Sequence, residues 1–307
     1  MRRIVVGSRG SRLALTQTES VIAKIREANP YLEVSLRKIV TTGDRDRHTQ
    51  LDRIGVAVFV KELEHALLDG RIDLAVHSLK DVPSEVPPEL RLLAVTERLD
   101  PRDALVAKSK LNELAPSSRI GTGSLRRTVQ LTQFRPDLQV CSIRGNVDTR
   151  LRKVSTGEVD GIVVAAAAML RLGWQDRITE YLPLEHFLPA VGQGALVLEA
   201  RLDDKEIEDL ISPLNYIPAW QSVMAERAFL RAIGGGCRAP IAALGAVSNS
   251  TLKLEGMIAS PDGRKMLRAS EEGSAMSPEE VGTRLAQKML AMGASEFIAE
   301  VRADESR

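Results

Sequence analysis

Residues 119–164 read RIGTGSLRRTVQLTQFRPDLQVCSIRGNVDTRLRKVSTGEVDGIVV, and short apolar runs alternate in this stretch with longer amphipathic ones. The apolar runs have the length of buried strands, and the amphipathic ones have helical spacing. The predicted elements are a strand ending at Ile120-Gly121, a helix over Ser124–Phe134, a strand over Leu138–Ile143, a helix over Val147–Thr156, a strand over Gly161–Val164 and an alanine-rich helix through Leu172. Strands that alternate with helices are typical of a parallel α/β sheet.

The first part of the chain repeats this alternation. The predicted elements are strands over Arg3–Gly7, Leu32–Val40 and Ile72–Val76 and helices over Arg12–Ala28 and Val58–Asp69. Ser11 is a suitable cap for the first helix. The polar stretch Thr41–Ile54 is predicted to be an exposed loop, and long loops of this kind are often functional.

The order changes from about Pro218, where a helix to Ile233 leads into a glycine-rich turn. Three strands and a final helix follow, near Ile241–Val247, Leu252–Ala259, Lys265–Ala269 and Pro278–Met292. This order predicts an α+β unit that is separate from the α/β part.

The composition excludes several classes of protein. Of the 307 residues, 44% are hydrophobic and 27% are charged, which is ordinary for a folded globular chain. Aromatic residues are only 3%, too few for a platform on which nucleic-acid bases stack. The N-terminus lacks a signal-peptide core, and the longest apolar run, Ile162–Leu170, is too short for a membrane helix. Two cysteines and four scattered histidines indicate neither a disulfide framework nor a metal site, so we expect a cytoplasmic protein without a metal.

A net charge of +1 conceals a local imbalance. Residues 1–12 hold four arginines and no acid, and residues 119–153 hold eight basic residues against two acidic ones. Seven of those eight are arginine, which binds carboxylates and phosphates in a bidentate way. A solvated basic face is the plainest interpretation, and nucleic-acid binding is a second. The excess of arginine at strand ends and helix starts favours a cleft for a small ligand with several anionic groups.

Polar clusters follow three predicted strands, at Gly7-Ser8-Arg9, Ser78–Asp81 and Gly121–Arg127. Ligands bind beyond the carboxyl ends of strands in open α/β sheets, so these clusters are candidate site segments. Asp81 is either a turn residue or a carboxylate that stabilises a cationic intermediate and moves protons. His77 is predicted to be a hydrogen-bonded structural residue rather than a base.

The two cysteines lie in different sequence contexts. Cys237 follows three glycines and precedes Arg238, so it is either a buried free cysteine or an accessible thiol activated by a neighbouring cation. Cys141 lies within a predicted strand and is expected to be a core thiol.

These clusters, in this order, resemble the porphobilinogen deaminase family, also called hydroxymethylbilane synthases. The resemblance spans nearly the whole chain and is carried by nine motifs: Gly7–Ala14, Val60–Glu64, Ala75–Pro83, Glu97–Ala104, Gly121–Arg127, Arg144–Arg150, Leu188–Ala195, Ala225–Ala228 and Gly236–Pro240. So many ordered motifs make the resemblance highly specific.

The resemblance implies two α/β lobes like those of periplasmic binding proteins and a small C-terminal α+β domain. The implied boundaries are 1–96 with 194–214, 97–193 and 215–307. It also implies a monomeric transferase of tetrapyrrole (heme) biosynthesis. Such an enzyme adds four porphobilinogen units, with loss of ammonia, to a dipyrromethane cofactor and releases the linear tetrapyrrole hydroxymethylbilane.

The resemblance implies roles for individual residues. Cys237 would hold the dipyrromethane through a thioether, and Asp81 would be the catalytic residue. Asp81 would also contact the cofactor. The remaining cofactor-binding residues would be Ser78, Lys80, Thr122, Ser124, Arg126, Arg127, Arg144, Arg150, Arg171 and Gln193. The substrate would be bound by Arg9, Ser11 and Gln17. The chief alternative is a two-lobed protein that binds a polyanionic small molecule without chemistry; neither nucleic acid nor a membrane is an expected partner.

Overall fold

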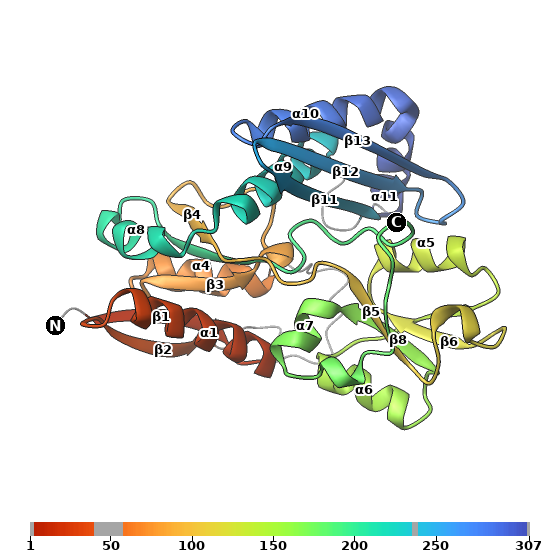
Figure 1. Ribbon diagram of the computed structural model, residues 1–307, viewed down its shortest axis with the longest axis horizontal. Coiled ribbons are helices and arrows are strands. Elements are labelled where there is room, and N and C mark those ends of the chain that lie inside the picture. The colour runs from red at the N-terminus through yellow and green to blue at the C-terminus, as the bar shows by residue number, and fades with distance from the viewer. Residues whose placement is uncertain (1–2, 40–57, 235–238, 306–307) are drawn as a thin grey trace. The chain divides into compact units, whose positions relative to one another are not determined.

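The computed structural model describes residues 3–39, 58–234 and 239–305 (Figure 1). They form two compact units. The first comprises the described residues up to Leu99 together with Ala195–Trp220, and the second comprises Asp100–Gly194 and the described residues from Gln221 onward. The predicted loop Thr41–Ile54 and the residue Cys237 lie outside the described residues.

The first unit is built on a five-stranded sheet with the order β2-β1-β3-β10-β4. Its strands are β1 (Arg3–Arg9), β2 (Glu33–Ile39), β3 (Leu74–Ser78), β4 (Leu90–Val95) and β10 (Leu196–Arg201). Its helices are α1 (Arg12–Ala28), α4 (Val58–Leu68) and α8 (Lys205–Ile211). β1 pairs in parallel with β2 and β3, whereas β10 runs antiparallel to both β3 and β4.

Helix α1 begins where the sequence predicts, because the side chain of Ser11 accepts a hydrogen bond from the backbone N–H of Ala14 at 3.3 Å. Its apolar face buries Val21, Ile22 and Ile25 against the sheet residues Ile4 and Val6. Burial of this face attaches the helix to the sheet and leaves its polar face to solvent.

The second unit contains another five-stranded sheet, with the order β7-β6-β8-β5-β9. The strands are β5 (Asp103–Ala107), β6 (Arg119–Thr122), β7 (Gln139–Ser142), β8 (Gly161–Ala165) and β9 (Glu180–Tyr181). The helices of this lobe are α5 (Leu125–Phe134), α6 (Val147–Ser155) and α7 (Ala166–Arg171). β6 pairs in parallel with β7 and β8, and β5 runs antiparallel to β8.

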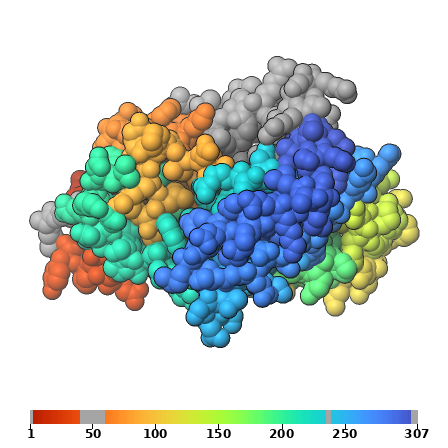
Figure 2. All heavy atoms as spheres, turned by 90° about the horizontal axis from the view of Figure 1, so that it is seen from above, coloured from red at the N-terminus to blue at the C-terminus, as the bar shows by residue number. Residues whose placement is uncertain are grey.

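The second unit also contains a three-stranded antiparallel sheet, β11 (Ile241–Ser248), β12 (Thr251–Ala259) and β13 (Met266–Ser274). It packs with the part of α9 (Ile217–Ile233) that begins at Gln221 and with α10 (Pro278–Met289) and α11 (Ser295–Glu305) around one apolar core. A second cluster joins this sheet to the lobe, since Val129 of α5 and Leu188 pack against Ala242 and Met257. Figure 2 shows atoms of the C-terminal sheet and helices (blue) beside those of the lobe (yellow-green).

The predicted fold class is confirmed: two α/β lobes and a smaller α+β part are present. The expectation of parallel sheets is wrong in detail, because β10 and β5 make both five-stranded sheets mixed. β4, β5, β9, β10 and α8 were not predicted. The three-domain boundaries expected from the sequence stay a prediction.

Two further expectations are corrected. The predicted helix Pro278–Met292 is α-helical only to Met289, and a π-helical turn, Leu290–Ala294, continues it. Gly293, with a φ of 100°, breaks this turn, and a separate helix, α11, follows. Cys141 is only half-buried, since β7 leaves part of its side chain outside the core of the lobe. None of the helices in the described ranges is long and apolar enough to cross a membrane.

Candidate active site

The first unit gathers several predicted site residues at one edge of its sheet. β1 and β3 are adjacent and parallel, with Val6 opposite Leu74 and Gly7 opposite Ala75. Their carboxyl ends therefore point the same way, and Arg9 and Ser78 end these two strands. Ser11, predicted to bind substrate, uses its hydroxyl to cap α1.

Gln17 and Ser78 are in direct contact. Gln17 Nε2 donates to Ser78 Oγ at 2.9 Å, and Gln17 is 5% exposed. This bond ties α1 to the end of β3, and a short 3-10 turn, Leu79–Asp81, follows there. Lys80 and Asp81 are both half-buried on this turn. The sequence predicted these residues as part of the site, and the structure brings Gln17 and Ser78 together.

A buried titratable group lies behind this edge. His77 Nε2 is 2.9 Å from Glu199 Oε2, and the side chains are 4% and 0% exposed. The other carboxylate oxygen of Glu199 has no hydrogen-bond partner among the described residues. Burial, together with the negative charge of Glu199, raises the pKa of Glu64. His77 is thus buried and hydrogen-bonded, as predicted, while the sequence did not point to Glu199.

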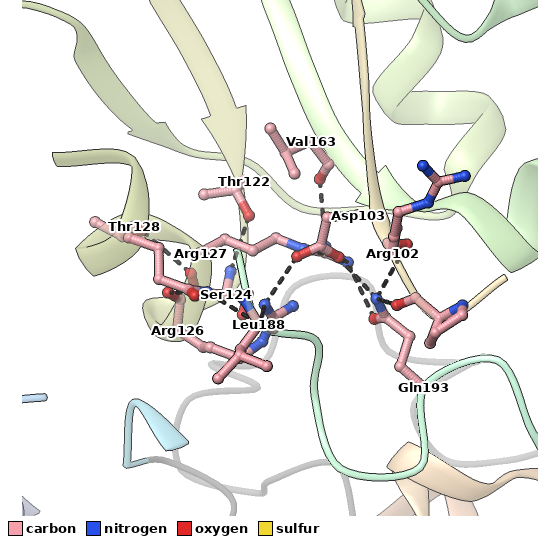
Figure 3. Close-up of polar contacts among 12 residues, drawn as sticks. Arg102, Asp103, Thr122, Ser124, Arg126, Arg127, Thr128, Val163, Leu188 and Gln193 are labelled. Atoms are coloured by element: carbon pink, nitrogen blue, oxygen red, sulfur yellow. Dashed lines mark hydrogen bonds and ion pairs between the residues drawn. The ribbon is translucent and has the colours of Figure 1, made fainter. Parts of the chain in front are cut away.

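The second unit holds a buried ionic network centred on Asp103, the first residue of β5 (Figure 3). Its carboxylate accepts hydrogen bonds from Arg126 Nη1 at 2.8 Å, from Arg127 Nη2 at 2.7 Å and from Gln193 Nε2 at 2.8 Å. Both arginines come from the first turn of α5, and Asp103 is completely buried. The structure thus brings Arg126, Arg127 and Gln193 together around an acid that the sequence reasoning missed.

Electrostatics of this network follow from burial and pairing. Burial alone raises the pKa of Asp103, but the positive charges and hydrogen bonds of Arg126 and Arg127 outweigh it and hold that pKa well below its usual range. Burial lowers the pKa of Arg126, against the attraction of Asp103. One acid therefore serves two buried cations, and the Nε of Arg126 has no hydrogen-bond partner among the described residues.

Two more predicted arginines lie in this unit without an acidic partner among the described residues. Arg150 Nε donates to the Gly145 carbonyl at 2.8 Å, and Arg171 Nη2 donates to the Gly194 carbonyl at 2.7 Å. Burial lowers the pKa of Arg171 to about 10. Burial and the charge of Arg127 lower the pKa of Arg150. Uncompensated, partly desolvated cations of this kind are costly unless an anion joins them.

The other predicted residues of this unit surround α5 and α6. Thr122 is buried, and its Oγ1 accepts a hydrogen bond from the backbone N–H of Ser124 at 3.3 Å. Ser124 precedes the first turn of α5, and Arg144 is exposed before α6. Of the predicted cofactor-binding residues, Cys237 lies outside the described residues.

The donor set fits a ligand with several carboxylates. Arg126, Arg127, Arg150 and Arg171 supply four cations against the one anion of Asp103, a net charge of +3. The unpaired Nε of Arg126 is a buried donor that still needs an acceptor. Among the described residues there is no cluster of acids, histidines and cysteines that could hold a metal ion.

Asp103 could have been found from the sequence. It stands immediately before the apolar run Ala104-Leu105-Val106, and an ionised residue at the start of a buried strand needs cations as partners. No spacing rule connects it to Arg126 or Gln193, because those contacts span 23 and 90 residues of sequence.

The fold and this site define a class of protein: two α/β lobes and a smaller α+β part, with a cationic site suited to a polycarboxylate. Comparison with known proteins makes the assignment specific. Residues 4–209 match the family model described as the porphobilinogen deaminase dipyromethane cofactor binding domain, and residues 220–291 match the porphobilinogen deaminase C-terminal domain. The chain belongs to the porphobilinogen deaminase family.

Curated relatives agree over nearly the full length. The porphobilinogen deaminase of Thermus thermophilus is 46% identical over 305 residues, covering 98% of this chain and 100% of the relative. That of Bacillus subtilis is 47% identical over 307 residues, covering 98% of this chain and 97% of the relative. Among solved structures, the effector binding domain of a BenM variant is similar with a TM-score of 0.41 and 18% identity, covering 70% of this chain and 93% of that one.

Proposed function

We propose that the chain is a hydroxymethylbilane synthase of tetrapyrrole (heme) biosynthesis. It is a transferase that joins four porphobilinogen units, losing ammonia each time, on a covalently bound dipyrromethane, and it releases the linear tetrapyrrole hydroxymethylbilane. One observation carries the proposal: the site in the second unit sets four arginines, Arg126, Arg127, Arg150 and Arg171, against the single acid Asp103. One buried guanidinium nitrogen of this set has no partner among the described residues. Each pyrrole of the product carries two carboxylates, which such a site would neutralise.

The dipyrromethane would be bound by the residues predicted above. Its thioether would form with Cys237, and its carboxylates would accept hydrogen bonds from a set of side chains: Ser78, Lys80, Thr122, Ser124, Arg126, Arg127, Arg144, Arg150, Arg171 and Gln193. When bound, the dipyrromethane supplies the pyrrole end to which porphobilinogen is joined. Within the second unit, Asp103 holds Arg126 and Arg127 in place, so their remaining donors are oriented before a carboxylate binds.

Asp81 is the proposed catalytic residue. When ammonia leaves porphobilinogen, the C–N bond breaks and positive charge develops on the substrate pyrrole. A carboxylate stabilises that charge and accepts the proton released after the new C–C bond forms. Asp81 lies on the turn that follows β3, and the bond between Gln17 and Ser78 braces the start of that turn. Arg9, Ser11 and Gln17 would bind the substrate on the same unit.

The alternative is a protein that binds a polyanionic ligand without reacting with it. Such a protein requires neither Asp81 nor Cys237, so this alternative is not favoured by membership in the deaminase family. A monomer working in the cytoplasm, without a nucleic-acid or membrane partner, is a further part of the proposal. Sedimentation of the purified chain would test the oligomeric state.

The intact mass of the purified protein tests the proposal. We expect one dipyrromethane in addition to the mass of the chain, and we expect this addition to be lost in Cys237→Ser. Cys141→Ser is the matched control and should keep the added mass. An unmodified wild-type chain that still converts porphobilinogen would contradict the covalent cofactor, and an added mass in Cys237→Ser would contradict the anchor.

A further inference from the structure

Glu226 is a buried carboxylate on α9 that the site described above does not use. Its side chain is completely buried, and both of its oxygens accept hydrogen bonds from backbone N–H groups. Oε2 accepts from Gly192 at 2.7 Å, and Oε1 accepts from Gly245 at 2.8 Å. Hydrogen bonds to an ionised acceptor are about twice as strong as neutral ones, so one side chain connects three segments firmly.

The first connected segment is the turn Gly192-Gln193-Gly194. Gly192 and Gly194 have φ values of 71° and 93°, a conformation that favours glycine and places Gln193 between two specialised positions. Gln193 donates to Asp103, and the Gly194 carbonyl accepts from Arg171. Glu226 therefore binds the turn at Gly192, and the other two residues of the turn, Gln193 and Gly194, contact the arginine network.

The second connected segment is β11, which carries Gly245. β11 is tied to the same loop a second time, because Ala243 N–H donates to the Pro189 carbonyl at 3.2 Å. Leu188 packs against Ala242 of β11 in the apolar cluster that joins the lobe to the C-terminal sheet. The residues from Leu188 to Gly192 are thus held against the C-terminal sheet by apolar packing and two hydrogen-bonded links.

The third segment is α9 itself. α9 ends at Ile233, and the chain reaches Cys237 four residues later. Glu226 lies two helical turns before that end. Its hydrogen bonds therefore hold the last part of the helix, which is the part nearest to Cys237 in the sequence. A displacement of α9 relative to the Gly192 turn would move Ile233, the end of the helix from which the chain continues to Cys237.

We propose that Glu226 is a positioning residue for cofactor attachment. It holds α9, the helix that precedes Cys237, in a fixed position relative to the Gly192-Gln193-Gly194 turn, which contacts the arginine network. This inference rests on the proposed function, because it presupposes a dipyrromethane on Cys237. It concerns only side chains and backbone of the second unit.

Cofactor loading measures this role separately from activity. Protein is made in a host starved of porphobilinogen, porphobilinogen is then added, and intact mass is followed with time for wild type, Glu226→Gln and Glu199→Gln. Glu199 is the matched control, since it is an equally buried acid in the first unit without a bond to the Gly192 turn. We expect Glu226→Gln to load at least tenfold more slowly than wild type and Glu199→Gln to load within twofold of it.

The outcomes separate the possibilities. Glu226→Gln loading at the wild-type rate, or both variants slowing equally, would overturn the inference. A wild-type chain that gains no mass would instead overturn the proposed function. Glu226→Asp keeps the charge but is one methylene shorter, so it should load at an intermediate rate.

A measurement on the unsubstituted apo-protein covers the case in which the Glu226 variants do not fold. We expect the amide hydrogens of Gly192 and Gly245 to exchange slowly in apo-protein, before any cofactor is present. Fast exchange of both amides would show that Glu226 does not hold the two segments, and it would overturn the inference.

Discussion

The carboxylate of Asp103 lies 2.7 Å from Nη2 of Arg127, and the two side chains are 0% and 7% exposed. Each of these two buried charges stabilises the other, because removing either side chain leaves an unpaired charge away from water. Arg126 shares the same anion.

Asp103→Asn should therefore destabilise the second unit strongly. We expect a loss of about 3–5 kcal/mol in the free energy of unfolding, the usual cost of removing one partner of a buried ion pair. Urea unfolding followed by circular dichroism measures it. Asp137→Asn, which breaks a pair with Arg135 on the surface, is the control and should change the unfolding midpoint much less. Equal midpoints for the two variants would contradict the importance of the buried network.

The same carboxylate makes stability depend on pH in a defined direction. The pKa of Asp103 is lowered on folding, so its contribution is present above the pKa of the unfolded chain, about 3.9 for an ordinary aspartate, and is lost as the pH falls toward the folded value. The difference in unfolding free energy between wild type and Asp103→Asn should be constant from pH 7 to about pH 5 and should shrink below about pH 4. A difference that grows on acidification would refute the assignment.

Arg171 should behave differently in the apo- and cofactor-loaded proteins. Burial lowers its pKa to about 10, and no acid among the described residues pairs with it, so the cation is unfavourable until an anion binds. Arg171→Met should leave the melting temperature of apo-protein unchanged or higher, yet reduce the additional stability that the cofactor confers. Arg201→Met is the control, because Arg201 pairs with Asp73 and Asp204 and its loss should destabilise both forms. Thermal scans of wild type and both variants, each in the apo- and the cofactor-loaded form, test this prediction.

Asp81→Asn should separate chemistry from cofactor attachment. Removing a general acid–base group costs about 10²–10⁴-fold in rate, so kcat for porphobilinogen consumption should fall by that factor. The intact mass should still show the added dipyrromethane, since Cys237 is untouched. Asn at this position with near-normal turnover would exclude Asp81 as the catalytic residue.

Gln17 and Ser78 should be energetically coupled. A double-mutant cycle of Gln17→Ala and Ser78→Ala should give an interaction energy of about 0.5–1.5 kcal/mol in unfolding free energy, as expected for one buried hydrogen bond. KM for porphobilinogen should rise in both single variants if the bond orients the turn that carries Asp81. Strictly additive effects would mean that the bond contributes nothing.

Local patterns in the sequence were sufficient for α1 and for the α/β character of the chain. The cap at Ser11 and the spacing of Val21 and Ile25 are read directly along the helix. Whether a strand runs parallel or antiparallel to its neighbours could not be predicted from local sequence, because it depends on which distant segment pairs with that strand. β10 pairs with β3 across more than a hundred residues, and the sequence around residue 196 does not indicate that the pairing is antiparallel.

The candidate site was likewise predictable only as far as local sequence patterns reach. An excess of arginine in one segment predicted an anion-binding cleft, and the place of Ser78 after a strand marked a candidate site segment. The resemblance to the family then assigned Arg126, Arg127 and Ser78 to the cofactor. The partners of Asp103 and Glu226 became visible only in three dimensions, because they lie far away in sequence. A single charged residue beside apolar ones has many possible partners, so local sequence alone does not select one.

The position of β10 has a consequence for how the protein is made. β10 lies inside the first sheet, between β3 and β4, yet it is encoded after the whole of the second α/β lobe. About two thirds of the chain must therefore be synthesised and leave the ribosome before the first sheet can be completed. Until then β3 and β4 lack their shared neighbour and present open edges, so we expect the nascent first lobe to depend on chaperones longer than the second lobe, whose sheet strands are contiguous in sequence.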